Sequence, residues 1–543
     1  MKSAAILLVT AGLLAACSPT DTTSSNAHTG HNTQASTESS SSGSSAPTEL
    51  LTGNEFTLTA KKANLQVNDQ VTKEVWTFNG SVPGPQLRVK LGEKIKVTLK
   101  NDLAEPVAIH WHGLPVPFQM DGIPGMTMNA VQPGGTYTYE FTASVPGTYW
   151  YHSHQDSVNQ LDRGLYGTFV VEADEPKPDR DYTLVLDEWM SNEDHMATMN
   201  NGSMNGMDHG SATGQSGEQT AAGHSGSGHE QTAASGHSGS GHEQTTTAAP
   251  AGGHDMSMYD LFTINGNSGE KIKPLVVKKG ERVRLRLVNA GYMSHKLHLH
   301  GHEYTVVATD GQKLNNPTPI KDQLLSIAPG ERYDLEFIAN QSGEWYLEEH
   351  SDNPAAKGMK VKIQYEGATA TGTDQPDDTK QLPVFNLASY GKKGDQTTFT
   401  LDQQYNLEYT MNLGTKDNGM KFTINDQSFP NVDPIKVKTG DLVKVKMVNT
   451  SEKDDHPMHL HGHFFQVLSK DGVPIQGSPI FKDTLNLKPG EEYVVAFKAD
   501  NTGDWMFHCH DLHHASMGMV TVLKYTDFQS TFVPDPKANN KPE

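Results

Sequence analysis

The chain has 543 residues, of which 35% are hydrophobic, and a formal net charge of −21. This length corresponds to about three domains at roughly 150 residues each. The negative charge argues against nucleic acid as a partner, because that binding depends on cationic side chains that neutralise phosphates. The cysteines are Cys17 and Cys509, which leaves no disulfide framework if Cys509 has a separate role.

The first 17 residues predict a lipoprotein signal peptide. Lys2 gives a basic start, and Ala4–Ala16 is an apolar run too short to span a membrane. The segment that ends at Cys17, Leu-Ala-Ala-Cys, resembles the lipobox of bacterial lipoproteins, in which the cysteine is lipidated. The alternative is plain cleavage that leaves a free cysteine. We expect an exported protein, held by a lipid anchor on the extracytoplasmic face of the cell membrane, with a flexible Ser/Thr-rich tether over residues 18–48.

A repeated pattern fills the rest of the chain. Residues 92–101, 280–289 and 440–449 each alternate polar and apolar side chains, which predicts a strand with one buried face. Four markers follow each of these strands at identical spacing: Pro133, Tyr137, Phe141 and Gly147; Pro329, Tyr333, Phe337 and Gly343; Pro489, Tyr493, Phe497 and Gly503. Such spacing identifies an internal repeat. Strands separated by Pro/Gly turns predict an all-β fold of three Greek-key β-sandwich domains, over residues 49–176, 259–367 and 380–530.

Histidines recur at two places in each repeat. A His-x-His-Gly motif begins at His110, His298 and His459, and a second triplet reads His-Ser-His from His152, Glu-Glu-His from Glu348 and His-Cys-His from His508. Alternation sends both imidazoles of a His-x-His motif to one face. The first and last domains thus offer eight imidazoles, four each: His110, His112, His152, His154, His459, His461, His508 and His510. These eight fit a copper cluster at the interface between the two domains.

An insertion of different composition covers residues 190–258, between the first two predicted domains. It contains seven Met and seven His, no Lys or Arg, and two copies of a Gly/Ser/His repeat thirteen residues apart. Such a segment does not fold alone. Met suits Cu(I) and His suits Cu(II), so we favour copper capture over a linker that expanded by repeat slippage.

The second domain carries further histidines: His295, His298, His300, His302 and His350. One interpretation is a fifth metal site. The other is a relic of domain duplication, with the imidazoles satisfied by hydrogen bonds. Counted from the shared glycine, Cys509 corresponds to Glu349 and His514 to Pro354, which favours the relic. We therefore expect no metal in this domain.

The stretch 508–519 holds the groups of a blue-copper site. On a strand, Cys509 points away from the face that carries His508 and His510. His514 and Met519 follow, and His456 precedes the third His-x-His-Gly motif. One Cys, two His and a weak Met ligand form a blue-copper electron-transfer site. The alternative, an ordinary buried thiol, does not explain the surrounding ligands.

Together these motifs resemble those of the multicopper oxidases, which include laccases, ascorbate oxidase and bacterial cuprous oxidases, and the repeat resembles the cupredoxin domain. Residues 508–519 match the family's HCHxxxHxxxGM motif. The resemblance implies four copper ions. It assigns the type 1 copper to His456, Cys509, His514 and Met519; the type 2 copper to His110 and His459; and the type 3 pair to His112, His152, His154, His461, His508 and His510.

The resemblance also implies a proton route. An acid at the position of Asp121 sits near the three-copper cluster in the family, although the Asp-Gly dipeptide alone indicates a turn. Several relatives carry Glu after the second type 1 His, whereas this chain has Ala515. Proton delivery is therefore expected to depend on Asp121, Asp511 or water. His513 is either a solvated neighbour or a group on the substrate side.

The predicted function is that of a laccase-like oxidase with a role in copper tolerance. It takes single electrons from phenols, aromatic amines and Cu(I), passes them from Cys509 to His508 and His510, and reduces O₂ to water. The alternatives are a non-catalytic surface copper scavenger and a ferroxidase or Mn(II) oxidase. The intact cluster motifs favour the oxidase over the scavenger, and a copper nitrite reductase has no use for eight cluster histidines.

Overall fold

The computed structural model describes residues 48–191, 256–351, 353–367, 382–394 and 399–542. All of them belong to one compact unit, Gly43–Glu543. The lipobox, the tether before residue 48 and residues 192–255 of the insertion lie outside the described residues, so the predictions for them stay predictions. Within the described part of the chain, no helix is long and apolar enough to cross a membrane.

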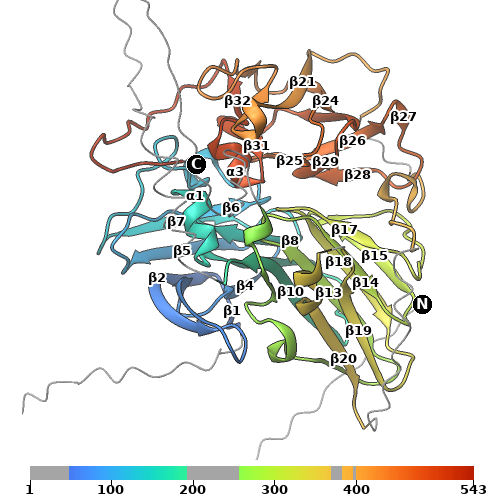
Figure 1. The fold of residues 1–543 in the computed structure, drawn as a ribbon. Coiled ribbons are helices and arrows are strands. Elements are labelled where there is room, and N and C mark those ends of the chain that lie inside the picture. The colour runs from blue at the N-terminus through green and yellow to red at the C-terminus, as the bar shows by residue number, and fades with distance from the viewer. Residues whose placement is uncertain (1–47, 192–255, 352, 368–381, 395–398, 543) are drawn as a thin grey trace, which may run out of the picture. The chain divides into compact units, whose positions relative to one another are not determined.

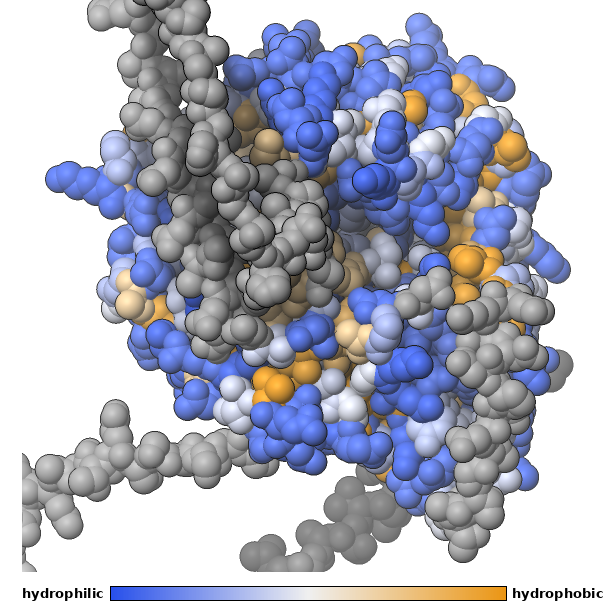
Figure 2. Space-filling model, viewed as in Figure 1, coloured by the Kyte–Doolittle hydropathy of each residue, from blue (hydrophilic) through white to orange (hydrophobic). Residues whose placement is uncertain are grey.

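The strands form six sheets in three consecutive pairs, and each pair is a β-sandwich with its own buried apolar core (Figure 1). The all-β prediction of three cupredoxin-like domains is confirmed. The repeated segments form the equivalent strands β5, β13 and β24, and their apolar side chains are buried as the alternation predicts. Figure 2 shows one face of the molecule, on which hydrophilic side chains predominate and hydrophobic ones are scattered.

Domain 1 has sheets in the order β1-β4-β9-β8-β6 and β3-β2-β5-β7. Its elements are β1 (Leu50–Thr52), β2 (Glu55–Gln66), β3 (Thr72–Phe78), β4 (Gly84–Lys90), β5 (Lys94–Asn101), β6 (His110–His112), β7 (Thr136–Thr142), β8 (Gly147–His152), α1 (Ser157–Asp162) and β9 (Tyr166–Glu172).

Domain 2 has sheets in the order β11-β10-β13-β18-β15-β16 and β12-β20-β19-β14-β17. Its strands are β10 (Arg180–Trp189), β11 (Leu261–Ile264), β12 (Leu275–Val277), β13 (Arg282–Asn289), β14 (His295–Leu299), β15 (Tyr304–Thr309), β16 (Gln312–Lys313), β17 (Leu325–Ile327), β18 (Arg332–Ile338), β19 (Glu344–Glu349) and β20 (Lys360–Tyr365).

Domain 3 has sheets in the order β22-β21-β24-β30-β26-β27, with β28 on β26, and β23-β32-β31-β25-β29. Its elements are β21 (Leu407–Lys416), β22 (Lys421–Ile424), β23 (Ile435–Val437), β24 (Leu442–Asn449), β25 (His456–Leu460), β26 (Phe465–Lys470), β27 (Val473–Pro474), β28 (Ile480–Lys482), β29 (Thr484–Leu487), β30 (Glu492–Lys498), β31 (Asp504–Cys509), α3 (Leu512–Ser516) and β32 (Val520–Tyr525).

Domain 2 begins earlier than the sequence predicts. β10 lies beside β13 (Figure 1), and the two pair in parallel from Arg180 opposite Val283 to Leu186 opposite Asn289. β10 also pairs antiparallel with β11. The predicted start at residue 259 was therefore wrong, and the insertion interrupts domain 2 between β10 and β11. The prediction followed the change in composition, whereas β10, which precedes that change, already belongs to the second β-sandwich.

Candidate metal centre

Matching strand pairs in domains 1 and 3 position the eight cluster histidines. In domain 1, β6 and β8 place His110 opposite His152. In domain 3, β25 and β31 place His459 opposite His508. The second histidine of each motif lies two residues further on, so each domain presents four imidazoles together.

The two sets of imidazoles meet across the interface. The His110 ring stacks on His461 with a centroid distance of 4.0 Å, and the His112 ring stacks on His459 at 3.7 Å. Three groups have ligand atoms within 4.8 Å of one another: His110, His112 and His459; His112, His152 and His510; His154, His461 and His508. The predicted type 2 residues and the six predicted type 3 residues thus form one cluster.

The hydrogen bonds of the cluster leave ligand atoms available. All eight histidines are at most 1% exposed. The Nδ1 atoms of His110, His152 and His459 lie 2.9–3.0 Å from the backbone oxygens of Asp121, Ser153 and Asp483, respectively. The Nε2 atoms of the same three rings form no hydrogen bond within the described chain. A neutral imidazole that donates from Nδ1 to a carbonyl keeps its Nε2 lone pair for a metal, so the residues fit copper.

Burial favours the neutral form of seven of these eight rings. It lowers the pKa of His152, His461 and His508 well below the usual value, and repulsion from neighbouring imidazoles adds to the effect. The pKa of His154 falls to about 3 for the same reasons. Since a metal binds the neutral imidazole, the cluster is ready to accept copper at neutral pH.

The predicted type 1 residues gather on the other face of β31. Cys509 Sγ lies 3.6 Å from His514 Nδ1 and 3.9 Å from His456 Nδ1, and these two nitrogens are 3.3 Å apart. Ser451 Oγ lies 2.7 Å from His456 Nε2 and fixes that ring with Nδ1 toward the thiol. Met519 is fully buried in the same apolar cluster, and its backbone oxygen accepts a hydrogen bond from Cys509 N. These side chains fit a blue copper.

Comparison with known proteins names the family. Models described as multicopper oxidase match residues 59–176, 180–368 and 397–529. The chain belongs to the multicopper oxidase family. As predicted, it is an oxidoreductase that uses oxygen, and its family binds four copper ions. The assignment of single residues to each copper is a proposal that the geometry above supports.

Relatives of this oxidase carry several names. It is 29% identical to a multicopper oxidase, MmcO, of Mycobacterium tuberculosis over 86% of both chains. It is 25% identical to copper resistance protein A of Escherichia coli over 87% of this chain and 93% of the relative. Among solved structures, a multicopper oxidase from Pseudomonas thermotolerans has a TM-score of 0.59 at 26% identity, covering 88% of this chain and all of the other. Fet3p, a multicopper oxidase that functions in iron import, has 21% identity and a TM-score of 0.66 over 88% of this chain and 91% of the other, and it shares the fold.

The oxidase holds two buried carboxylates against the cluster. Asp121 lies there as predicted, with Oδ2 2.9 Å from His461 Nδ1 and Oδ1 3.2 Å from His110 Nδ1. Asp483 was missed by the sequence analysis. Its Oδ1 lies 3.2 Å from His112 Nε2 and 2.7 Å from the guanidinium of Arg332. Burial opposes ionisation of Asp483, but Arg332 outweighs it and lowers the pKa of the carboxyl.

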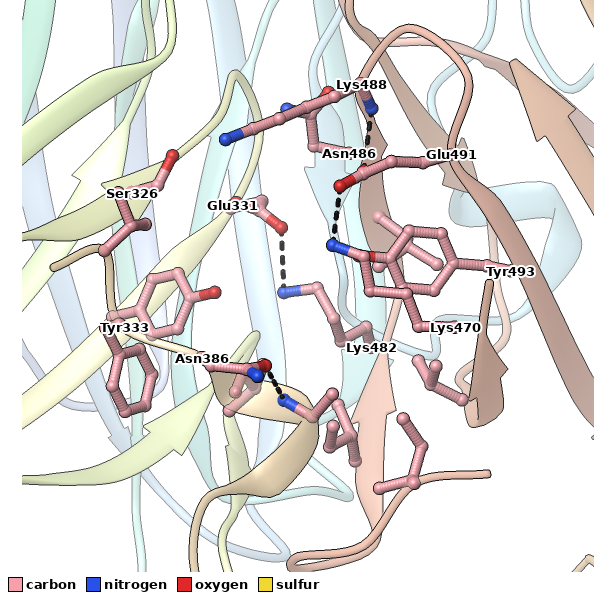
Figure 3. Close-up of a pocket in the computed structure, with 18 residues that line it drawn as sticks. Ser326, Glu331, Tyr333, Asn386, Lys470, Lys482, Asn486, Lys488, Glu491 and Tyr493 are labelled. Carbon is pink, nitrogen blue, oxygen red and sulfur yellow. Dashed lines mark hydrogen bonds and ion pairs between the residues drawn. The ribbon is translucent and has the colours of Figure 1, made fainter. Parts of the chain in front are cut away.

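A pocket lined by both polar and apolar side chains lies between domains 2 and 3 (Figure 3). Its volume is about 150 Å³. Lys482 lines it and contacts Glu331 at 3.1 Å and Asp310 at 3.0 Å. None of the copper-ligand candidates is among its lining residues. The pocket is thus separate from the metal centre.

The histidines of domain 2 divide into two kinds. His295 Nε2 lies 3.2 Å from the buried Glu188, and His302 uses both ring nitrogens, toward His300 O at 2.8 Å and Tyr365 Oη at 2.7 Å. These two are satisfied as the relic interpretation predicts. The other three, His298, His300 and His350, come together as a group of possible ligands.

Proposed function

We propose that this oxidase oxidises phenols, aromatic amines and Cu(I) at the type 1 site and serves copper tolerance. The observation that carries the proposal is the end of β31. There Cys509 faces His456 and His514, while its neighbours His508 and His510 belong to the three-copper cluster. One short stretch of chain therefore joins the site that takes electrons to the site that meets oxygen.

The proposed ligands divide between the two sites. His456, Cys509, His514 and Met519 hold the type 1 copper; His110 and His459 hold the type 2 copper; His112, His152, His154, His461, His508 and His510 hold the type 3 pair. Copper supplies the one-electron chemistry and the reaction with oxygen when bound. The chain fixes the geometry of the ligands and excludes bulk water from the cluster. Asp121, beside His461, is the proposed carrier of protons to that cluster.

The names of the relatives and the place of the insertion support Cu(I) as a donor. Relatives at 25% identity over 87% of this chain include copper resistance protein A. The insertion leaves and re-enters the fold at one point, where Ser191 donates two hydrogen bonds to Asp260. Next to it, Tyr259 Oη lies 3.2 Å from His513 Nε2 in α3, the helix that also carries His514. The Met/His-rich segment is therefore attached beside the type 1 site.

We also propose that the protein is exported and anchored by a lipid on Cys17. The basic start, the short apolar run and the lipobox-like segment support this. A Cys17→Ser variant should leave the membrane fraction, because the lipid chains hold the anchor.

Oxygen uptake with a phenol and with Cu(I), measured side by side, tests the proposed donors. Cys509→Ser should be colourless and inactive with both donors. Deletion of residues 192–255 keeps the Ser191–Asp260 contact and should leave phenol turnover unchanged. It should slow Cu(I) turnover at low Cu(I) concentration.

A blue protein without oxygen uptake would instead be a copper scavenger, and faster oxygen uptake with Fe(II) or Mn(II) would favour a ferroxidase or an Mn(II) oxidase. Unchanged Cu(I) kinetics would reduce the insertion to a spacer.

A further inference from the structure

Domain 2 repeats the geometry that builds half of the three-copper cluster in domain 3. β14 and β19 place His298 opposite Glu348, as β25 and β31 place His459 opposite His508. The residues two positions further, His300 and His350, correspond to His461 and His510. We call His298, His300, Glu348 and His350 the domain 2 cluster. All four of its positions carry a side chain able to bind a metal.

The ligand atoms of the domain 2 cluster converge. His300 Nε2 lies 3.1 Å from His350 Nε2 and 2.8 Å from Glu348 Oε1, and His350 Nε2 lies 3.3 Å from the same oxygen. A tetrahedral ion with bonds of about 2.0–2.1 Å has ligand atoms roughly 3.3–3.4 Å apart. The three observed separations are close to this spacing. Glu348 Oε2 contacts Lys360 at 2.7 Å, which orients the carboxylate and leaves Oε1 for an ion.

Hydrogen bonds alone do not account for His298. This side chain is 7% exposed, and within the described residues neither ring nitrogen has a hydrogen-bond partner. Asp322 Oδ1 lies 3.6 Å from His298 Nε2. The ring belongs to the same group of possible ligands as His300 and His350. A buried imidazole without hydrogen bonds loses its hydration without compensation, unless a metal takes its lone pair.

The chemistry of the domain 2 cluster selects the ion. Three imidazoles and one carboxylate suit Zn(II) and Cu(II). The type 1 positions are lost, because Glu349 and Pro354 stand where domain 3 has Cys509 and His514. Asp322 is 55% exposed and Glu348 is 19% exposed, so an ion can reach the cluster from solvent.

We propose that domain 2 binds one divalent late transition-metal ion, Cu(II) or Zn(II), in addition to the four coppers of the oxidase. This replaces the prediction from sequence that domain 2 holds no metal. On this proposal, domain 2 has lost the type 1 site but has kept side chains able to bind a metal at the cluster positions. The ion would tie β14 to β19.

Zn²⁺ titration of the full-length, copper-loaded oxidase tests the proposal. The wild type should retain one more equivalent of metal, counted as Cu²⁺ plus Zn²⁺, after gel filtration than His300→Gln or Glu348→Ala. Glu348→His, which reproduces the ligand set of domain 3, should restore that equivalent. His229→Gln, in the insertion, is the matched control and should not lose it. Blue absorption reports that each variant has folded.

Two outcomes would overturn the proposal. One is an equal total of Cu²⁺ plus Zn²⁺ in the wild type, His300→Gln and Glu348→Ala, with all three blue. The other is a loss of this metal in Glu348→Ala that Glu348→His does not restore, because an imidazole at this position should replace the carboxylate as a ligand. Cu²⁺ added in place of Zn²⁺ should follow the same order of variants.

Discussion

Asp121 shows how much one side chain can do in this oxidase. It is 2% exposed, and its two carboxylate oxygens face an imidazole of domain 1 and an imidazole of domain 3. An asparagine keeps the shape and one acceptor oxygen but cannot carry the charge or exchange a proton. The residue thus combines positioning of the cluster with the proposed delivery of protons.

Asp121→Asn should lower kcat for oxygen consumption by about 10²-fold, at the lower end of what general acid–base groups contribute. Blue absorption should persist, because the type 1 ligands are not touched. The measurement is kcat against pH with a phenol, on an oxygen electrode. A change in how kcat depends on pH distinguishes proton delivery from positioning. An unchanged kcat and profile would remove Asp121 from the proton route.

Single residues of the site were predictable where they belong to a sequence motif. The copper-ligand candidates follow His-x-His and His-Cys-His triplets, and alternation on a strand already separates Cys509 from His508. Asp483 and Arg332 belong to no such motif, because each is paired with a residue of another domain. The signal that could have found Asp483 is the charged pair Lys482-Asp483, which directly follows the apolar pair Ile480-Phe481.

At the level of elements, helix α3 sets the position of His514. The helix has five residues, too short to be stable by itself. Asp511 caps it, accepting hydrogen bonds from the backbone N–H groups of His513 at 3.1 Å and His514 at 3.4 Å. Asp511 Oδ2 also lies 3.3 Å from His514 Nε2. The cap therefore holds both the helix and the ring that faces Cys509.

Asp511→Ala should weaken the type 1 site. Loss of an N-cap costs about 1 kcal/mol, and His514 also loses the carboxylate that orients its ring. We expect the blue absorption to disappear at a lower chelator concentration than in the wild type. Asp511→Asn keeps a capping oxygen, so its blue absorption should disappear at a chelator concentration between those of Asp511→Ala and the wild type. Ser516→Ala, at the other end of α3, is the control and should behave like the wild type. Equal chelator resistance of Asp511→Ala and the wild type would contradict this role of the cap.

The strands themselves were the most predictable elements. The alternating segments became β5, β13 and β24 because one buried face imposes period two. The start of domain 2 was not predictable in this way. β10 precedes an insertion of more than sixty residues, 192–255 with its flanks, and its partner β13 lies beyond it. Pairing across such a distance leaves no local signal.

For the molecule as a whole, the pair Arg332–Asp483 joins all three domains. Arg332 comes from β18 of domain 2, and its Nη1 and Nη2 atoms donate to the two oxygens of Asp483 in domain 3 at 2.7 and 2.6 Å. Arg332 Nε donates to the backbone oxygen of Thr148 in domain 1 at 3.3 Å. Both charged side chains are fully buried. The Asp483 carboxylate also lies 3.2 Å from His112 Nε2 and 3.5 Å from His459 Nδ1, so the contact between domains and the three-copper cluster share one carboxylate.

Arg332→Met should destabilise the oxidase strongly, because it leaves the Asp483 carboxylate buried without its counter-charge. Breaking a buried ion pair in this way costs about 3–5 kcal/mol. In Arg332→Met/Asp483→Asn no charge is stranded, so the double variant should recover part of that loss. Unfolding midpoints of the single and double variants, measured at one copper loading, give the coupling between the two side chains. Oxygen consumption should fall in the double variant, since there His112 and His459 lose the carboxylate beside them. A double variant no more stable than Arg332→Met would mean that packing of the guanidinium, and not its charge, holds the three domains together.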